Sequence, residues 1–308
     1  MNMRTWLTLV ILAGVALPRP AAAQCDYEII RPDEWQPAGY GFPGTFPGSW
    51  RVAVAMAAAD NVLAMACFLY ESPEYYWFHE PFRIPGVVIF RRVNDAWVFD
   101  ELLLDPKRRV SPGIEFGASL AIRDGRVLVG AHRELFLYER GADGWSVEAV
   151  ITAQPDTPGS SFHFNEMVTW TADQIIAAGT YDDPAHGEHD TRAVAVLESD
   201  EFETWRVTQL IPNPIPDQDD SFGSGLAVDG DRLVVGALGA GMLIVYEREN
   251  GLWQQSDIID GAQWGLWGLG NPALDIHEKH IVAATPSQSD LDDTGELSIF
   301  DFLAFQNA

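Results

Sequence analysis

Five short apolar runs, each ending in small residues, constrain this chain more than any other feature of its sequence. They begin at residues 62, 127, 175, 233 and 281, so their spacings are 65, 48, 58 and 48 residues. The runs are Val62–Ala66, Val127–Ala131, Ile175–Gly179, Leu233–Ala237 and Ile281–Thr285. A recurring period of this length indicates that each copy is one supersecondary unit, which must stack on its neighbours to bury its apolar face.

The neighbours of each run repeat as well. An alternating strand precedes the run, and in two copies an Asp-Gly pair, at residues 124–125 and 229–230, predicts a tight hairpin turn because glycine tolerates a positive φ. A third strand rich in aromatic residues follows. A fourth strand opens with a tryptophan in four copies, at Trp97, Trp145, Trp205 and Trp253. Four strands in a fixed order, with a basic period of about 48 residues, predict the blades of a β-propeller.

The last copy has no fourth strand before Ala308, whereas Cys25–Pro32 resembles the fourth strands that contain Arg206–Pro212 and Gln255–Asp260. We therefore predict an all-β fold, a five-bladed β-propeller of four-stranded antiparallel blades, closed by the N-terminal strand joining the last blade. Closure removes free sheet edges that invite aggregation. The expected blades span about residues 50–106, 115–155, 162–214, 222–261 and 265–308 with 25–32.

Two segments, Phe116–Ala131 and Phe222–Ala237, resemble the FG-GAP repeats of bacterial exported proteins. The similarity is weaker around Phe162 and Phe164 and extends only to the strand pattern in the first and fifth copies. This resemblance implies a β-propeller used for binding or surface display. The calcium loop of integrin-type FG-GAP blades does not carry over, because the turns between the first two strands are too short here.

The segment from Asp290 to Asn307 resembles one calcium-loop half of a bacterial dockerin. The resemblance implies a calcium site, since this hard cation prefers oxygen ligands, with residues at loop positions 1, 3, 5, 7 and 12. These are Asp290, Asp292, Thr294, the carbonyl of Glu296, and Asp301. Thr294 departs from the usual Asp, and no second half follows. The same residues 290–308 fit the second loop and third strand of the last blade, so a blade, a truncated dockerin and a solvated acidic loop remain alternatives.

Residues 1–23 have the pattern of a signal peptide, with Arg4, an apolar stretch from Trp6 to Leu17 and Ala21–Ala23 before the expected cleavage site. The apolar stretch is too short to span a bilayer, and no later stretch is long and apolar enough to do so. We expect a secreted, cell-surface or periplasmic chain without a transmembrane segment, and a monomer. In such a compartment Cys25 and Cys67 are expected to form one disulfide; the alternative is two unpaired thiols.

The net charge of −26 argues against nucleic-acid binding, which needs a basic surface, and suits the attraction of cations. In an up-and-down blade, the loops after the second strand and between blades emerge on one face, and the insertions fall in these loops. The loop of the first copy is rich in aromatic residues that stack on sugar rings or anchor a protein. These candidate ligand-binding residues are Tyr70, Tyr75, Tyr76, Trp77 and Phe78; the alternative is a loop that covers the propeller.

Catalysis has weaker support. Some five-bladed propellers are glycosidases with carboxylates around the central channel, and Glu115, Glu166 and Asp275 lie near the ends of the expected innermost strands. None of them belongs to a catalytic motif, and the expected innermost strands are small and apolar. We therefore expect an exported, non-catalytic propeller that binds an unidentified protein or carbohydrate, with calcium as a candidate cofactor. The alternatives are a dockerin-tethered extracellular protein and a glycosidase-like hydrolase.

Overall fold

The computed structural model of the chain describes residues 55–59, 61–70, 83–107, 116–131, 133–153, 161–164, 167–183, 188–200, 204–215, 221–264, 269, 274–278, 280–285 and 296–301. Within these residues the structure is built almost entirely of β-strands, and η3 (Gly261–Trp264) is a single short 3-10 turn. No helix in the described part of the chain is both long and apolar enough to cross a membrane.

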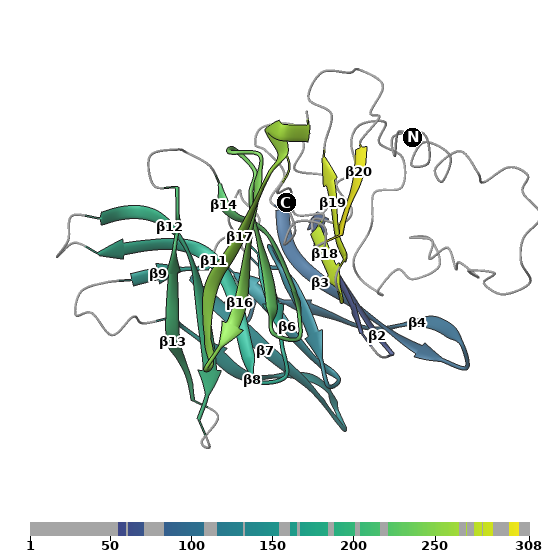
Figure 1. Cartoon of the computed structure of the whole chain (residues 1–308). Helices are drawn as coiled ribbons and strands as arrows, with labels where there is room; N and C mark the ends of the chain where they lie inside the picture. Colours follow the sequence, from purple (N-terminus) through teal and green to yellow (C-terminus); the bar gives the residue numbers. More distant parts are fainter. Residues whose placement is uncertain are drawn as a thin grey trace, which may run out of the picture. The chain divides into compact units, whose positions relative to one another are not determined.

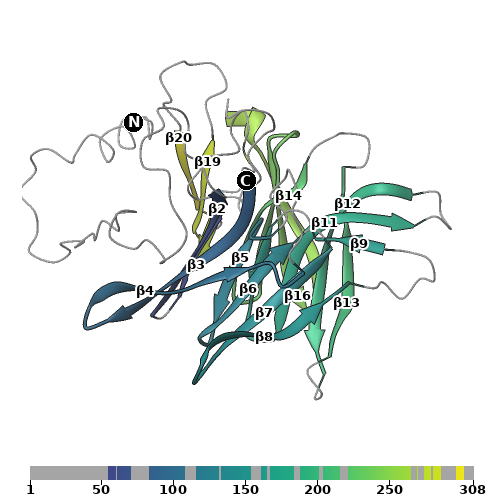
Figure 2. The same ribbon diagram turned by 180° about the vertical axis from the view of Figure 1, so that it is seen from behind.

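The strands form five antiparallel sheets in chain order (Figures 1 and 2). Sheet 1 consists of β1 (Met56–Ala59), β2 (Val62–Tyr70), β3 (Arg83–Val93) and β4 (Ala96–Leu104). Sheet 2 consists of β5 (Leu120–Arg123), β6 (Arg126–Ala131), β7 (Glu134–Gly141) and β8 (Gly144–Ile151). Sheet 3 consists of β9 (Ser161–His163), β10 (Val168–Trp170), β11 (Gln174–Asp183), β12 (Glu188–Ser199) and β13 (Trp205–Pro212). Sheet 4 consists of β14 (Phe222–Asp229), β15 (Arg232–Ala237), β16 (Met242–Glu249) and β17 (Leu252–Asp260), and sheet 5 of β18 (Leu274–His277), β19 (His280–Thr285) and β20 (Glu296–Asp301).

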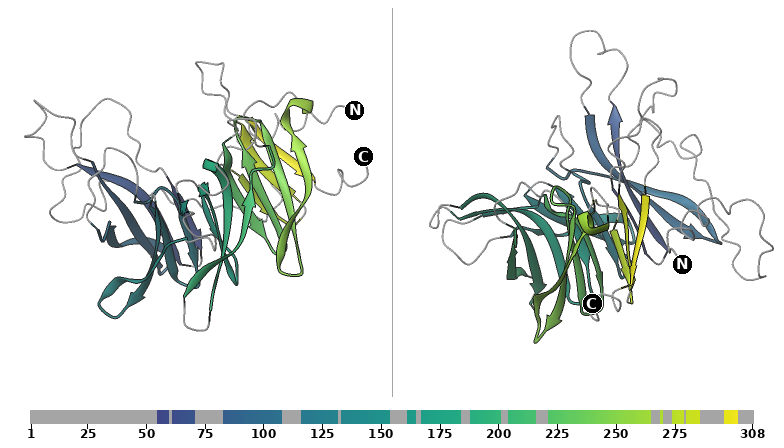
Figure 3. Two further views of the ribbon diagram at one scale, coloured as in Figure 1. Left: turned by 90° about the vertical axis from the view of Figure 1, so that its left-hand side faces the viewer. Right: turned by 45° about the horizontal axis from the view of Figure 1, so that its top comes forward.

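Each sheet is a meander in which consecutive strands pair, and β9 is an extra short strand that pairs with the far end of β11. All five apolar runs form the second strand of a sheet, namely β2, β6, β11, β15 and β19. The first strands of successive sheets contact one another, β1 with β5, β5 with β10, β10 with β14 and β14 with β18. Figure 3 shows the meanders from two further sides. The chain is therefore an all-β propeller with four-stranded antiparallel blades, as predicted.

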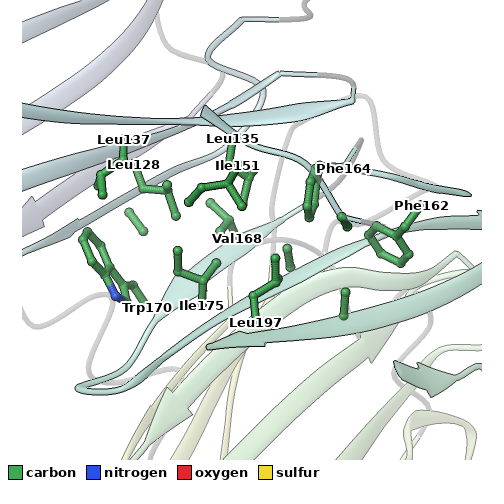
Figure 4. Close-up of a cluster of buried hydrophobic side chains, with 14 of the residues drawn as sticks. Leu128, Leu135, Leu137, Ile151, Phe162, Phe164, Val168, Trp170, Ile175 and Leu197 are labelled. Atoms are coloured by element: carbon green, nitrogen blue, oxygen red, sulfur yellow. The ribbon is translucent and has the colours of Figure 1, made fainter. Parts of the chain in front are cut away.

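The core lies in the seams between successive sheets, which we number first to fourth. Residues of β6 alternate between two seams, because Val127 and Val129 pack in the cluster with sheet 1 whereas Leu128 packs in the cluster with sheet 3. Figure 4 shows the second of these clusters, in which Leu128 and Leu135 from sheet 2 lie against side chains of sheet 3. A second strand buried on both faces explains why the runs are continuously apolar rather than alternating.

The Phe-Gly pairs before the two best-matched runs are packing elements of the seams. Phe222 is fully buried at the third seam, and the next residue, Gly223, has a φ of 91°. A Cβ atom on Gly223 would lie 2.5 Å from the Ala178 Cβ atom of the preceding sheet. Gly117 repeats this arrangement against Ala66 at the first seam, with a φ of 86°. The small residues of the runs therefore leave room for the glycine of the next sheet.

Several expectations about the ends of the chain fall partly outside the described residues. Cys67 is buried and forms no disulfide with any described residue, and burial raises the pKa of its thiol to about 12. Its expected partner Cys25 lies outside the described residues, so the disulfide stays a prediction. The closing strand Cys25–Pro32 also lies outside them. In sheet 5, Glu296–Asp301 forms strand β20 and pairs with β19 along its whole length, as the blade alternative requires.

Candidate functional site

A cavity of about 210 Å³ lies at the second seam, between sheets 2 and 3. It is bordered by the β5–β6 turn, the β10–β11 turn and the facing parts of β8 and β13. Leu137 and Trp170, both labelled in Figure 4, belong to the apolar cluster that underlies it. The lining residues are Arg123, Asp124, Arg126, Leu137, Glu148, Ala149, Trp170, Ala172, Asp173, Ser199 and Trp205. The cavity thus combines an apolar floor with charged groups of both signs.

The charged groups are incompletely satisfied. The Arg126 guanidinium lies 5.1 Å from the centre of the Trp170 ring, and its Nη1 donates a hydrogen bond of 3.3 Å to Glu148 Oε1. The other carboxylate oxygen, Glu148 Oε2, is buried and accepts no hydrogen bond from any described residue. Arg123 Nε lies 3.3 Å from Asp124 Oδ2 but is also without a hydrogen bond in the described part of the chain. Two polar atoms at the edge of the cavity are therefore buried without a partner among the described residues, as are Arg91 Nε and Arg248 Nε at the first and third seams.

At the first seam, residues of sheet 2 interlock with sheet 1. The Trp145 indole Nε1 donates to Asp100 Oδ2 over 2.7 Å, and the Trp145 backbone N donates to Glu101 Oε2 over 2.9 Å. Arg140 crosses the seam to the same aspartate through two hydrogen bonds, of 2.9 and 3.2 Å. Burial opposes ionisation of Asp100, but bonds from Arg140, Trp145 and Arg91 outweigh it and hold the Asp100 pKa below its usual value.

The third seam interlocks in the same way. The Trp253 indole Nε1 donates to Gln174 Oε1 over 2.9 Å, and the side chain of Gln209 both accepts from Trp253 N and donates to Trp253 O. Arg248 crosses to Asp173 with hydrogen bonds of 3.1 and 2.7 Å, which lower the Asp173 pKa. Both interlocked seams therefore join one tryptophan and one arginine of the later sheet to polar side chains of the earlier sheet.

The second seam lacks two of the residues that interlock the first and third seams: the arginine of the later sheet, and the polar residue of the earlier sheet that holds the tryptophan backbone. In the third and fourth strands of each sheet, the tryptophan pairs across the ladder with Arg140 in sheet 2, with Arg248 in sheet 4, but with Ser199 in sheet 3. Four residues after the tryptophan, Glu101 and Gln209 hold the backbone of the next sheet, whereas sheet 2 has Ala149. Trp205 consequently has no hydrogen bond to sheet 2 among the described residues and contacts Trp170 edge-on at 6.4 Å. We call the hydrogen bonds that join the tryptophan and the arginine of one sheet to the preceding sheet the latch. The cavity lies where this latch is missing.

Most residues that the sequence singles out lie elsewhere or outside the described part. Tyr70 ends β2, Glu296 begins β20 and Asp301 ends it. Asp275 is exposed on β18, where its Oδ1 accepts a hydrogen bond from Ile276 N. The residues outside the described part are Tyr75, Tyr76, Trp77, Phe78, Asp290, Asp292, Thr294, Glu115 and Glu166. Among the described residues, no three His, Cys, Asp or Glu side chains are grouped to hold a metal ion.

Sequence reasoning missed the seam cavity. The signal was present as two departures from the repeat, Ser199 and Ala149, but their meaning depends on the strand register that pairs each with its neighbours. The expected binding face, formed by loops after the second strands, lies at the opposite ends of those strands from the β5–β6 and β10–β11 turns that border the cavity. The cavity is thus a second candidate, distinct from the aromatic loop.

Comparison with known proteins does not place the chain in a family. No family model matches the sequence, and no curated protein matches it. Among solved structures, a protein of unknown function from Desulfotomaculum acetoxidans aligns at 12% identity over 83% of this chain and 70% of its own, with a TM-score of 0.49. The periplasmic gluconolactonase of Pseudomonas aeruginosa aligns at 14% identity over 80% of this chain and 71% of its own, with a TM-score of 0.47. These similarities are too low to assign an activity.

Proposed function

We propose that this chain is an exported, non-catalytic β-propeller that binds a ligand, and that the cavity at the second seam is its binding site. One observation carries the proposal: the latch that fills the first and third seams is absent from the second, which leaves an open cavity beside two tryptophans. Charged side chains in the lining, among them Arg123 and Glu148, supply polar groups that fix a ligand's orientation.

The expected architecture belongs to the same proposal. Five blades are supported by five sheets in chain order, of which the last has three described strands. The fourth strand of the last blade is the segment Cys25–Pro32, by its similarity to the strands that form β13 and β17. Export is supported by the signal-peptide pattern of residues 1–23. Calcium at the loop from Asp290 and a ligand at the aromatic loop remain further predictions.

The binding proposal is tested by a panel of compounds on the mature chain, comprising amines, amino acids, sugars and organic acids. Binding is followed by the rise in melting temperature and by tryptophan fluorescence. The fluorescence is expected to respond because Trp170 and Trp205 border the cavity. At least one class is expected to bind the wild type and to lose binding in Ala149→Phe, which fills the cavity. Val150→Phe is the matched control, since Val150 is the next residue of β8, is 48% exposed and does not line the cavity.

The outcomes separate binding from catalysis. A bound compound recovered unchanged after prolonged incubation supports a non-catalytic role, whereas its hydrolysis contradicts that role. If every compound that binds the wild type binds Ala149→Phe equally well, the cavity is not the site.

A further inference from the structure

We infer that the cavity at the second seam takes a guanidinium group on a short alkyl chain, in the place where an arginine of the protein lies at the first and third seams. This inference rests on the proposed function and adds the class of ligand. It follows from comparing three seams built on one repeat: the first and third seams show which groups are missing at the second seam.

The two complete seams each contain an arginine, a tryptophan and a carboxylate, and the carboxylate lies on β4 at the first seam but in the β10–β11 turn at the third. Arg140 and Arg248 each cross from the later sheet to a carboxylate, Asp100 or Asp173, with two hydrogen bonds. At the third seam the guanidinium of Arg248 also lies 6.0 Å from the centre of the Trp253 ring, the distance of a cation–π contact. A planar guanidinium suits this environment because it donates in parallel pairs to a carboxylate and stacks on an aromatic face.

The second seam retains the tryptophan and the carboxylate but has Ser199 at the arginine position. Trp205 corresponds to Trp145 and Trp253, each opening the fourth strand of its sheet. Glu148 follows Trp145 by three residues, as Asp100 follows Trp97, so the two carboxylates hold equivalent positions on β8 and β4. The buried Glu148 Oε2 accepts no hydrogen bond from any described residue. Both kinds of group that hold an internal arginine elsewhere thus line this cavity, and an external guanidinium would pair with Oε2 once the Glu148 side chain turns toward it.

Size and charge agree with this ligand. About 210 Å³ is less than the roughly 300–1,000 Å³ of pockets for drug-sized ligands, and suits a single side chain. Arg126 hydrogen-bonds Glu148 through Oε1 and lies over Trp170, so a second guanidinium would use the other oxygen, Oε2, and the ring of Trp205. The net charge of −26 raises the local concentration of cations around the chain.

The test uses agmatine and a short arginine-containing peptide as probes, titrated into the mature wild-type chain by calorimetry and tryptophan fluorescence. Agmatine carries an ammonium as well as a guanidinium, so the peptide and its citrulline version isolate the contribution of the guanidinium. The uncharged citrulline version of the peptide is expected to bind at least tenfold more weakly. Inorganic phosphate is the anionic probe, and the ionic strength is kept equal in all titrations.

Two variants locate the binding. Ser199→Arg restores the arginine of the other seams, so we expect it to abolish agmatine binding and to raise the melting temperature. Ser146→Arg is its matched control, because it adds the same charge at an exposed position of β8 outside the cavity and leaves the dissociation constant within about twofold. Glu148→Gln is expected to weaken agmatine binding at least tenfold, since it removes the carboxylate that the guanidinium pairs with.

Each contrary outcome has a distinct meaning. Agmatine binding that survives Ser199→Arg overturns the inference, as does phosphate binding lost in Arg123→Gln but kept in Glu148→Gln. If agmatine does not bind while another class of compound binds in a manner blocked by Ala149→Phe, the guanidinium inference fails and the proposed function stands. If no compound depends on the cavity, both fail.

Discussion

At the scale of single residues, a few buried polar side chains hold each seam in register. Asp100 is the clearest case, with a side chain only 9% exposed and with Arg140, Trp145 and Arg91 around it. Arg91 Nε lies 2.9 Å from Asp100 Oδ1, so one carboxylate joins its own sheet to the next. Such a group is costly to bury alone and stabilises the protein only while it is ionised and fully paired.

Asp100→Asn should therefore lower the free energy of unfolding by about 1–3 kcal/mol near pH 7. A carboxyl with a lowered folded pKa contributes stability that is fully present above its unfolded pKa, about 3.9, and is lost as the pH falls through the folded pKa. The free energy of unfolding of the wild type, measured with urea, should thus decrease below about pH 4, and this pH dependence should be smaller in Asp100→Asn. Asp95→Asn, whose side chain is 95% exposed, is the control and should leave both unchanged.

At the scale of elements, the sequence predicts the strand order because an apolar run recurs in every copy, as a strand buried on both faces requires. Two copies add a hairpin turn with a positive-φ glycine, such as Gly230, and a Phe-Gly pair that packs against small residues of the preceding sheet. The extra strand β9 and the cavity are not predictable in this way. They arise where a copy departs from the repeat, and Ser199 acquires meaning only beside Trp205 in the folded register.

The Phe-Gly element gives a prediction of its own. Gly223→Ala should destabilise the chain by about 2–4 kcal/mol, because a φ of 91° strains any side chain and the new Cβ would lie 2.5 Å from Ala178 Cβ. Gly230→Ala is the matched control, since Gly230 also has a positive φ, 58°, but open space around it. Its cost should be about 1–2 kcal/mol, from backbone strain alone. Equal losses of melting temperature in both variants would contradict close packing at the third seam.

At the scale of the whole molecule, the seams make each sheet depend on its neighbours. Four apolar clusters lie between successive described sheets. Each described sheet therefore buries its apolar side chains against a neighbouring sheet. A chain of such units has two exposed ends unless its first and last units join. Sheet 5 has three described strands, whereas sheets 1, 2 and 4 have four. A strand donated from the N-terminal segment would give sheet 5 a fourth strand.

Closure by Cys25–Pro32 can be tested with two adjacent substitutions in the same strand. By similarity to β17, Ile30 corresponds to Ile259, which is 2% exposed, and Ile29 to Ile258, which is 41% exposed. Ile30→Asp should therefore lower the melting temperature of the mature chain by several degrees or more, because it places a charge in the fourth-strand core position. Ile29→Asp should have little effect. Since both variants keep Cys25 and the same charge, equal melting temperatures would show that this strand does not complete the last blade.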